Sequence, residues 1–306
     1  MEIVQHCLAC QQQEFRTVQR TKAMMHPSEE AFNFDQCQNC GLVFLNPRVE
    51  VERLMDYYTD YYLPYRGDLA WGKYAHLVAS SQVKMDRQRV ALVNGFVPLN
   101  TESTVVDIGC GKPTFLEQLQ QKYKCNAVGT DFSDEGWKNE LERFGNLDLR
   151  YGEIEEIELP PADAITMWHY LEHDYAPAKT LQHLRNTVKN DTHLIIEVPN
   201  YDSESRQQFG KHWAGWHTPR HTALYTPDSM TTLLENNGWQ VKKILTHGTL
   251  DPYNLYWMSQ MEKRGIDWSK NMEEEFVNYV IGMIKFLPKR WKKSSLGVMT
   301  AVAVPA

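Results

Sequence analysis

The feature that most limits the fold of this chain is a glycine turn that follows a short apolar stretch. Val105 and Val106 lead into the acidic residue Asp107, and Gly109 and Gly111 follow with one residue between them. An amphipathic run comes next, so the pattern predicts strand, tight turn and helix, the first unit of an open α/β sheet. Glycine lacks a Cβ and lets the backbone approach a ligand closely. The turn therefore predicts a ligand at the carboxyl edge of a parallel sheet.

A second acidic residue indicates what kind of ligand this is. Residues 127–129 are expected to form the neighbouring strand, which ends close to Asp131. A carboxylate about twenty residues after the turn can accept hydrogen bonds from both hydroxyls of a ribose. A dinucleotide site would need glycine or alanine at Thr114, and neither stands there. The pair predicts a cofactor that contains one nucleoside.

The turn resembles motif I of class I S-adenosylmethionine-dependent methyltransferases, whose usual form is Asp/Glu-x-Gly-x-Gly-x-Gly. Pro113 replaces the last glycine, and because proline fixes φ we expect a stiffer loop. Further segments similar to this family follow in order at residues 151–154, 163–173, 193–200, 209–213 and 219–221. The chain is identified as a member of the bacterial subgroup that carries an N-terminal zinc ribbon with four cysteine ligands.

The resemblance implies an α/β, Rossmann-like sheet of seven strands, with the last strand antiparallel, and a set of cofactor contacts. Asp131 would hold the ribose, Phe132 would pack on adenine, and Glu153 would lie near the base edge. Met167 or Trp168 would offer a carbonyl to the methionine ammonium. The full set implied to bind S-adenosylmethionine is Asp107, Gly109, Cys110, Gly111, Asp131, Phe132, Glu153, Ile154, Met167 and Trp168.

Histidines gather where the fourth and fifth strands are expected to end. His169 and His173 lie four residues apart, and His217 and His221 flank a Pro-Arg pair. The resemblance places the Pro-Arg-His segment near the methyl acceptor. It implies His217 or His221 as the base or orienting group. Arg220 would hold an anionic part of the substrate, and His173 would shape the pocket. A metal site made of the four histidines and a purely structural role for each are the alternatives.

The N-terminal segment carries an independent signal, two C-x-x-C pairs separated by 26 residues. Four thiolates presented in this way can enclose Zn²⁺ in a tetrahedron, and four protein ligands indicate a structural ion. Disulfides agree less well, since no signal peptide precedes the first pair and a reducing cytoplasm is expected. The predicted zinc ligands are Cys7, Cys10, Cys37 and Cys40.

The chain is expected to divide into a zinc ribbon (1–48), a tyrosine-rich helical linker or lid (49–99) and a methyltransferase domain (100–306). In the middle part, the spacing of five tyrosines predicts one helical face that covers the site or packs into the core. These tyrosines are Tyr57, Tyr58, Tyr61, Tyr62 and Tyr65.

Charge narrows the class of partner. The 306 residues carry a net charge of −7, whereas binding to nucleic acid needs concentrated positive charge, so a small-molecule acceptor is expected. Two other functions stay open: an RNA methyltransferase, because some such enzymes also carry a zinc module, and a non-catalytic cofactor-binding protein. No stretch approaches the roughly twenty apolar residues of a membrane span.

One basic and aromatic stretch, residues 284–293, allows two interpretations. It can be a helix end whose cations complement the helix dipole. Alternatively, it contacts an anionic membrane surface or an acidic carrier protein.

Overall fold

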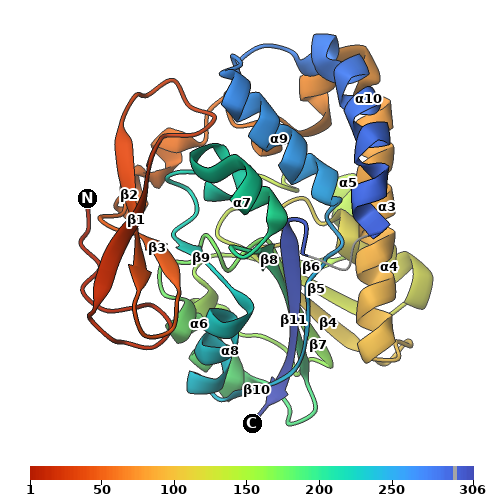
Figure 1. Ribbon diagram of the computed structural model, residues 1–306. Helices are drawn as coiled ribbons and strands as arrows, with labels where there is room; N and C mark the ends of the chain where they lie inside the picture. The colour runs from red at the N-terminus through yellow and green to blue at the C-terminus, as the bar shows by residue number, and fades with distance from the viewer. Residues whose placement is uncertain (292–294) are drawn as a thin grey trace.

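The computed structural model describes residues 1–291 and 295–306. Its centre is a seven-stranded sheet of order β10-β11-β8-β7-β4-β5-β6 (Figure 1). Strand β11 pairs antiparallel with both β8 and β10, and the pairs from β8 to β6 are parallel. The predicted sheet and its antiparallel last strand are thus confirmed. The strands are β4 (Thr104–Ile108), β5 (Asn126–Asp131), β6 (Asp148–Tyr151), β7 (Ala164–Trp168), β8 (His193–Pro199), β10 (Trp239–Leu245) and β11 (Val298–Pro305).

Alternation along the strands supplies an apolar core on each face of the sheet. Val105 and Ile195 pack with helices α3 (Ala75–Phe96) and α4 (Thr114–Tyr123). The next residues in each strand, Val106 and Ile196, pack with α6 (Pro177–Thr187) and α8 (Pro227–Asn236). Because successive strand side chains point to opposite faces, continuous apolar strands can be covered on both sides, as in Figure 1. The result is a three-layer α/β unit.

A second sheet joins the N-terminal segment to the middle of the chain. Its order is β1 (Phe15–Lys22), β2 (Ala31–Cys37), β3 (Val43–Leu45) and β9 (Ala223–Leu224). Val43 and Phe44 pair with Leu224 and Ala223 of β9, which lies far from them in the sequence. The N-terminal strands therefore do not form a sheet of their own, since β9 completes it.

The tyrosine-rich segment is not one helix, and the expectation of a single helical face is wrong. It is divided into α1 (Val51–Leu54), η1 (Met55–Tyr57), α2 (Leu63–Arg66) and η2 (Gly67–Tyr74). The break among the five tyrosines falls at residues 58–62, between η1 and α2. Further along, Gly67 and Gly72 have φ of +58° and +51°, which interrupts the helical run again. Tyr57 and Tyr62 are nevertheless buried, whereas Tyr65 is exposed.

The basic and aromatic stretch, residues 284–293, lies near the end of the chain. Arg290 donates to both carboxylate oxygens of Asp251, and Lys289 donates to Gln208, so these two cations of the basic stretch have partners within the chain. Lys292 and Lys293 lie outside the described residues.

No helix in the described part is both long and apolar enough to cross a membrane. The other elements are α5 (Leu141–Phe144), η3 (Ile154–Glu156), α7 (Glu204–Phe209), η4 (Gly210–His212), η5 (Ala214–Trp216), α9 (Pro252–Arg264), η6 (Met272–Glu275), α10 (Phe276–Phe286) and η7 (Leu287–Trp291).

Candidate active site

The glycine turn after β4 and the carboxylate that ends β5 meet at the edge of the sheet. Gly109 and Gly111 have φ of +72° and +50°, a conformation that favours glycine. The main-chain N–H of Gly111 donates to Oδ2 of Asp131 at 2.9 Å. A Cβ on Gly136 would lie 2.2 Å from the carbonyl oxygen of Gly111, so another backbone segment packs directly on the turn. The two predicted halves of the cofactor site are therefore adjacent.

The residues expected near the nucleoside follow the same strand ends. Phe132 is 66% exposed, which leaves its ring free to receive a planar ligand. Ile154 is buried and Glu153 is exposed, and both begin the segment after β6. Burial raises the pKa of Asp131, while hydrogen bonds from Gly111 and Ser133 oppose that shift.

Three other expected cofactor residues have side chains that are buried or half-buried. Met167 belongs to the core beneath the sheet, and the ring of Trp168 packs edge-on to Phe115 with centroids 5.5 Å apart. Cys110 is half-buried, and burial raises the pKa of its thiol well above the usual value. These residues can thus present main-chain atoms to a ligand, but Met167 and Trp168 cannot present their side chains.

Asp107 is a buried carboxyl whose titration gives a pH prediction. Thr166 donates to it at 2.6 Å, yet burial dominates and raises its pKa to about 7. In the unfolded chain this carboxyl ionises near pH 3.9, whereas in the folded protein it keeps its proton up to about pH 7. The stabilisation from protonated Asp107 is therefore complete below pH 3.9, decreases as the pH rises and is lost by about pH 7. It amounts to about 4 kcal/mol, as an order of magnitude.

We therefore expect Asp107→Asn to unfold at a higher urea concentration than the wild type at pH 8, and at a similar concentration at pH 4.5. The amide keeps an acceptor for Thr166 and cannot ionise, so only the wild type loses stability over this range. Urea unfolding of both proteins across this range, without ligand, measures the difference. Two curves that stay parallel would show that Asp107 does not titrate there.

The histidine segments after β7 and β8 lie against each other. The carbonyl oxygen of Glu172 accepts from the N–H of Thr222 at 2.7 Å, which joins the two loops. The ring centroid of His221 lies 4.6 Å from that of His173 and 4.7 Å from that of His217. The three histidines predicted for catalysis are thus one cluster. Because β7 is the neighbour of β4, the cluster lies at the edge of the sheet that carries the glycine turn.

Tyr170 connects this cluster to the glycine turn, although the sequence did not suggest a role for it. A Cβ on Gly109 would lie 2.4 Å from its ring. The ring therefore packs on the turn itself, three residues before His173. Only glycine at position 109 allows this contact, which explains a second requirement for glycine there.

Burial keeps the three rings neutral. It lowers the pKa of His173, His217 and His221, and the nearby Arg220 cation lowers it further for His217. Nε2 of His217 is buried without a hydrogen-bond partner among the described residues, and the Tyr62 hydroxyl lies 3.3 Å from its Nδ1. His217 also has a φ of +33°, which is unusual for a residue other than glycine. A neutral imidazole with an unpaired nitrogen can accept a proton.

Two buried carboxylates complete the cluster, and the sequence analysis missed both roles. His169 lies between them, with Nδ1 3.1 Å from Glu172 and Nε2 3.2 Å from Glu197. Burial alone would lower the pKa of His169, but these contacts outweigh it and raise the pKa to about 9. Burial likewise opposes the shift of Glu197, whose pKa the histidine and the Thr249 N–H lower to about 2. The signal was a charged residue inside the apolar run of β8, which requires a buried partner.

Arg220 has contacts that differ from the expectation. Its side chain is fully buried, and its terminal nitrogens donate to the carbonyl oxygens of Tyr57 at 2.7 Å and Met24 at 2.6 Å. The guanidinium also stacks 3.9 Å over the ring of Tyr62. Two of its five N–H groups are therefore used within the chain, while Nε has no partner among the described residues. Arg220 thus connects the histidine loop to the N-terminal part, and its expected hold on an anionic substrate stays a prediction.

The four N-terminal cysteines converge as predicted for a metal site. Their sulfur atoms all lie within 4.8 Å of one another, and the Cys7–Cys40 and Cys10–Cys37 pairs are each 3.5 Å apart. A tetrahedral zinc with Zn–S bonds near 2.3 Å requires sulfur separations of roughly 3.8 Å. The four thiols therefore fit a zinc ion.

Both cysteine pairs have the same local turn. The N–H of Gln11 donates to the carbonyl oxygen of Cys7, and the N–H of Gly41 donates to the carbonyl oxygen of Cys37. Gln11 and Gly41 have φ of +62° and +76°, so each pair ends in a left-handed residue. This matched geometry presents two thiols from each turn toward the other.

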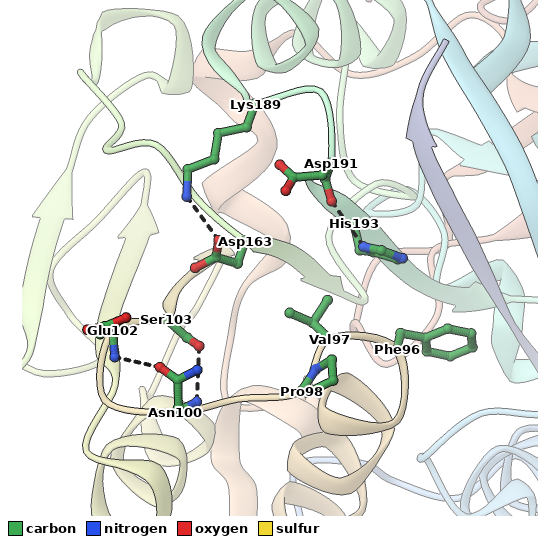
Figure 2. Close-up of a pocket in the computed structure, with 10 residues that line it drawn as sticks. All are labelled: Phe96, Val97, Pro98, Asn100, Glu102, Ser103, Asp163, Lys189, Asp191 and His193. Atoms are coloured by element: carbon green, nitrogen blue, oxygen red, sulfur yellow. Dashed lines mark hydrogen bonds and ion pairs between the residues drawn. The ribbon is translucent and has the colours of Figure 1, made fainter.

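A cavity of about 460 Å³ lies at the amino ends of the parallel strands, opposite the ends that carry the glycine turn (Figure 2). Asp163 and His193, which stand at the start of β7 and β8, contribute to its wall. Lys189 donates to Asp163 at 2.9 Å, and Asn100 accepts from the Glu102 N–H at 2.8 Å. These polar groups already have partners, and the cavity is remote from the glycine turn.

The strand order, the glycine turn and the paired acidic residue define the Rossmann-like methyltransferase fold. A family model described as "Methyltransferase domain" matches residues 81–244, more than half of the chain. The chain belongs to this methyltransferase family. No curated protein sequence matches it.

Solved structures share the fold at low sequence identity. Mycolic acid cyclopropane synthase CmaA1, complexed with SAH and CTAB, has a TM-score of 0.50 and 16% identity over 71% of this chain and 82% of its own. A putative methyltransferase in complex with the Trm112 activator of Haloferax volcanii has a TM-score of 0.50 and 16% identity over 78% and 96%. The [4+2]-cyclase SpnF also has a TM-score of 0.50, with 12% identity over 72% and 81%. These likenesses concern the fold, which supports more than one reaction.

Proposed function

We propose that the protein transfers a methyl group from S-adenosylmethionine to a small-molecule acceptor. The observation that carries this proposal is the junction of the glycine turn with Asp131, at the strand ends where open α/β folds bind ligands. Asp131 offers its carboxylate to the ribose, and Phe132 offers an exposed ring to the adenine. The main chain from Gly109 to Gly111 approaches the methionine part. The cyclopropane synthase that shares this fold was solved with SAH, which agrees with a cofactor site in this protein.

We assign the histidine cluster to the acceptor. Methyl transfer from a sulfonium is an in-line displacement, for which the protein supplies alignment and, for a hydroxyl or amine, a base. Nε2 of His217 has no hydrogen-bond partner in the part of the chain that the structure describes, and His221 lies beside it. His217 is the proposed base, while His221 and His173 orient the acceptor. Arg220 holds the loop in place through Tyr57 and Met24.

The acceptor is proposed to be a sugar, a glycan or a secondary-metabolite intermediate. The net charge of −7 disfavours a nucleic acid, because phosphate binding needs a basic surface. Contact of the basic stretch with an anionic surface or an acidic carrier stays a prediction, as does a cytoplasmic location.

We further propose that the four cysteines bind a structural zinc, which would assign the chain to the zinc-ribbon subgroup. The proposed division is a zinc ribbon (1–48), a linker (49–99) and a methyltransferase domain (100–306). Helix α3 of the proposed linker packs on α4 of the proposed methyltransferase domain, and the Thr114 hydroxyl donates to Asp86 of α3 at 2.7 Å. The end of the linker is therefore in direct contact with that domain.

Asp131→Ala tests the cofactor assignment. We expect S-adenosylhomocysteine affinity to fall by about 2–4 kcal/mol, because two charge-assisted hydrogen bonds to the ribose are lost. This corresponds to roughly 30- to 1000-fold in Kd. Isothermal titration calorimetry measures it, and Glu135→Ala, an exposed carboxylate on the same loop, should bind as the wild type does. Equal affinity in the Asp131 variant would contradict the site.

A further inference from the structure

Three side chains beside the proposed acceptor site, Glu172, His173 and His221, form a group with the composition of a metal site. One potential ligand atom from each lies within 4.8 Å of the other two. Glu172 and His173 follow β7, and His221 precedes β9, so two loops supply the ligands. Two imidazoles and one carboxylate are the protein ligands of zinc enzymes in which one coordination position stays open.

Each of the two imidazoles has one nitrogen engaged by a main-chain carbonyl. Nδ1 of His173 lies 3.1 Å from the carbonyl oxygen of Arg220, and Nδ1 of His221 lies 2.8 Å from that of Gly215. A carbonyl oxygen only accepts, so Nδ1 carries the proton in both rings and Nε2 presents a lone pair. Metal-binding histidines are oriented in this way by a hydrogen bond from the second nitrogen.

The carboxylate of Glu172 is buried and only half satisfied. Its Oε1 lies 3.1 Å from Nδ1 of His169, whereas Oε2 has no partner among the described residues. Leaving a buried carboxylate oxygen unpaired costs free energy, and a cation supplies the missing partner. His169, held by Glu197 on its other side, fixes the orientation of the carboxylate.

We infer that Glu172 Oε2, His173 Nε2 and His221 Nε2 bind a divalent cation of the zinc type, distinct from the ion of the four cysteines. Three protein ligands leave a position for water or for an oxygen of the acceptor. This use of the position rests on the proposed methyl transfer. A hydroxyl bound to the ion becomes more acidic, and its proton passes to Nε2 of His217 as its oxygen forms a bond to the methyl group. The sulfur–methyl bond breaks and leaves a neutral thioether. The site thus favours acceptors that present an oxygen.

Zinc content separates the two sites. Each purified protein is equilibrated with Zn²⁺, freed of unbound ion and analysed for zinc per chain. We expect about two ions for the wild type and about one for Glu172→Gln and for His221→Ala, because three protein ligands are needed to retain the second ion. His193→Ala is the matched control, since His193 lies at the opposite edge of the sheet, and it should keep both ions. Thermal unfolding verifies that each variant is folded.

Cobalt distinguishes the ligands without relying on the variants. The first equivalent of Co²⁺ should give a thiolate charge-transfer band from the cysteine site. The second should add visible absorption with no further thiolate band, and this step should be absent in His221→Ala. A wild type that takes up one ion only, with a thiolate spectrum alone, would overturn the inference.

Calorimetry with S-adenosylhomocysteine on the same samples separates this inference from the proposed function. A second ion without binding of S-adenosylhomocysteine supports the metal site and contradicts the cofactor assignment. Binding of S-adenosylhomocysteine without a second ion contradicts the metal site and leaves the methyl transfer standing.

Discussion

Replacing His217 by alanine is expected to lower the rate of methyl transfer by about 10²- to 10⁴-fold, the usual contribution of a general base. The ring is buried, its pKa is lowered by burial, and its Nε2 has no partner among the described residues, so it is neutral and free to take a proton. Turnover under saturating cofactor, measured as release of S-adenosylhomocysteine, gives the size of the loss. Affinity for S-adenosylhomocysteine should change little, because His217 belongs to the acceptor side.

Two comparisons make this result specific. His193→Ala removes an imidazole at the far edge of the sheet and should leave turnover unchanged. Tyr62→Phe removes the hydroxyl 3.3 Å from His217 Nδ1 and should lower turnover by a smaller factor, since only the orientation of the ring is affected. Unchanged turnover in the His217 variant would refute its role as base.

Loss of one zinc ligand is expected to have the largest effect on stability. Cys37→Ser should release the ion of the four cysteines and lower the free energy of unfolding by several kcal/mol, on the order of the whole stability of a small domain. Cys7 and Cys37 are buried within the apolar cluster that also contains Val106 and Met167 of the central sheet, so the damage should extend beyond the N-terminal segment. Zinc analysis and thermal unfolding measure both parts of the prediction.

A thiol elsewhere provides the control for this experiment. Cys125 is buried between α4 and the sheet, on the other face. Cys125→Ala should lose some packing energy but keep the ion. If Cys37→Ser kept its zinc and its melting temperature, the cysteines would have no metal-binding role.

The central sheet could be predicted because its signals are local. Mainly apolar strands such as residues 193–199, each followed by a turn, imply a parallel sheet covered on both faces. The glycine turn identifies the first of these strands along the chain. The carboxyl edge then brings together residues that lie far apart in the sequence. This reasoning placed the three histidines proposed for catalysis on one edge, where the ring centroids of neighbouring pairs are 4.6 and 4.7 Å apart.

Pairings between distant segments could not be predicted in the same way. The residues around Ala223 do not predict a strand that completes the N-terminal sheet, because the two residues of β9 are too few to show an alternation of apolar and polar side chains. The contacts of Arg220 with Met24 and Tyr57 depend on the folded positions of three segments. The division of the tyrosine-rich segment could not be predicted either, because the break between η1 and α2 falls at residues 58–62, which contain no glycine or proline.

The pairing of β3 with β9 bears on how such enzymes could be recombined. A chimaera that joined strands β1 to β3 to the rest of a different enzyme would leave β3 without its two-residue partner. The incoming half would have to bring the peptide from Thr218 to Tyr225 with it, and that peptide also carries His221. Exchange of the N-terminal strands therefore entails exchange of the peptide that carries His221, so the two segments are expected to be inherited together.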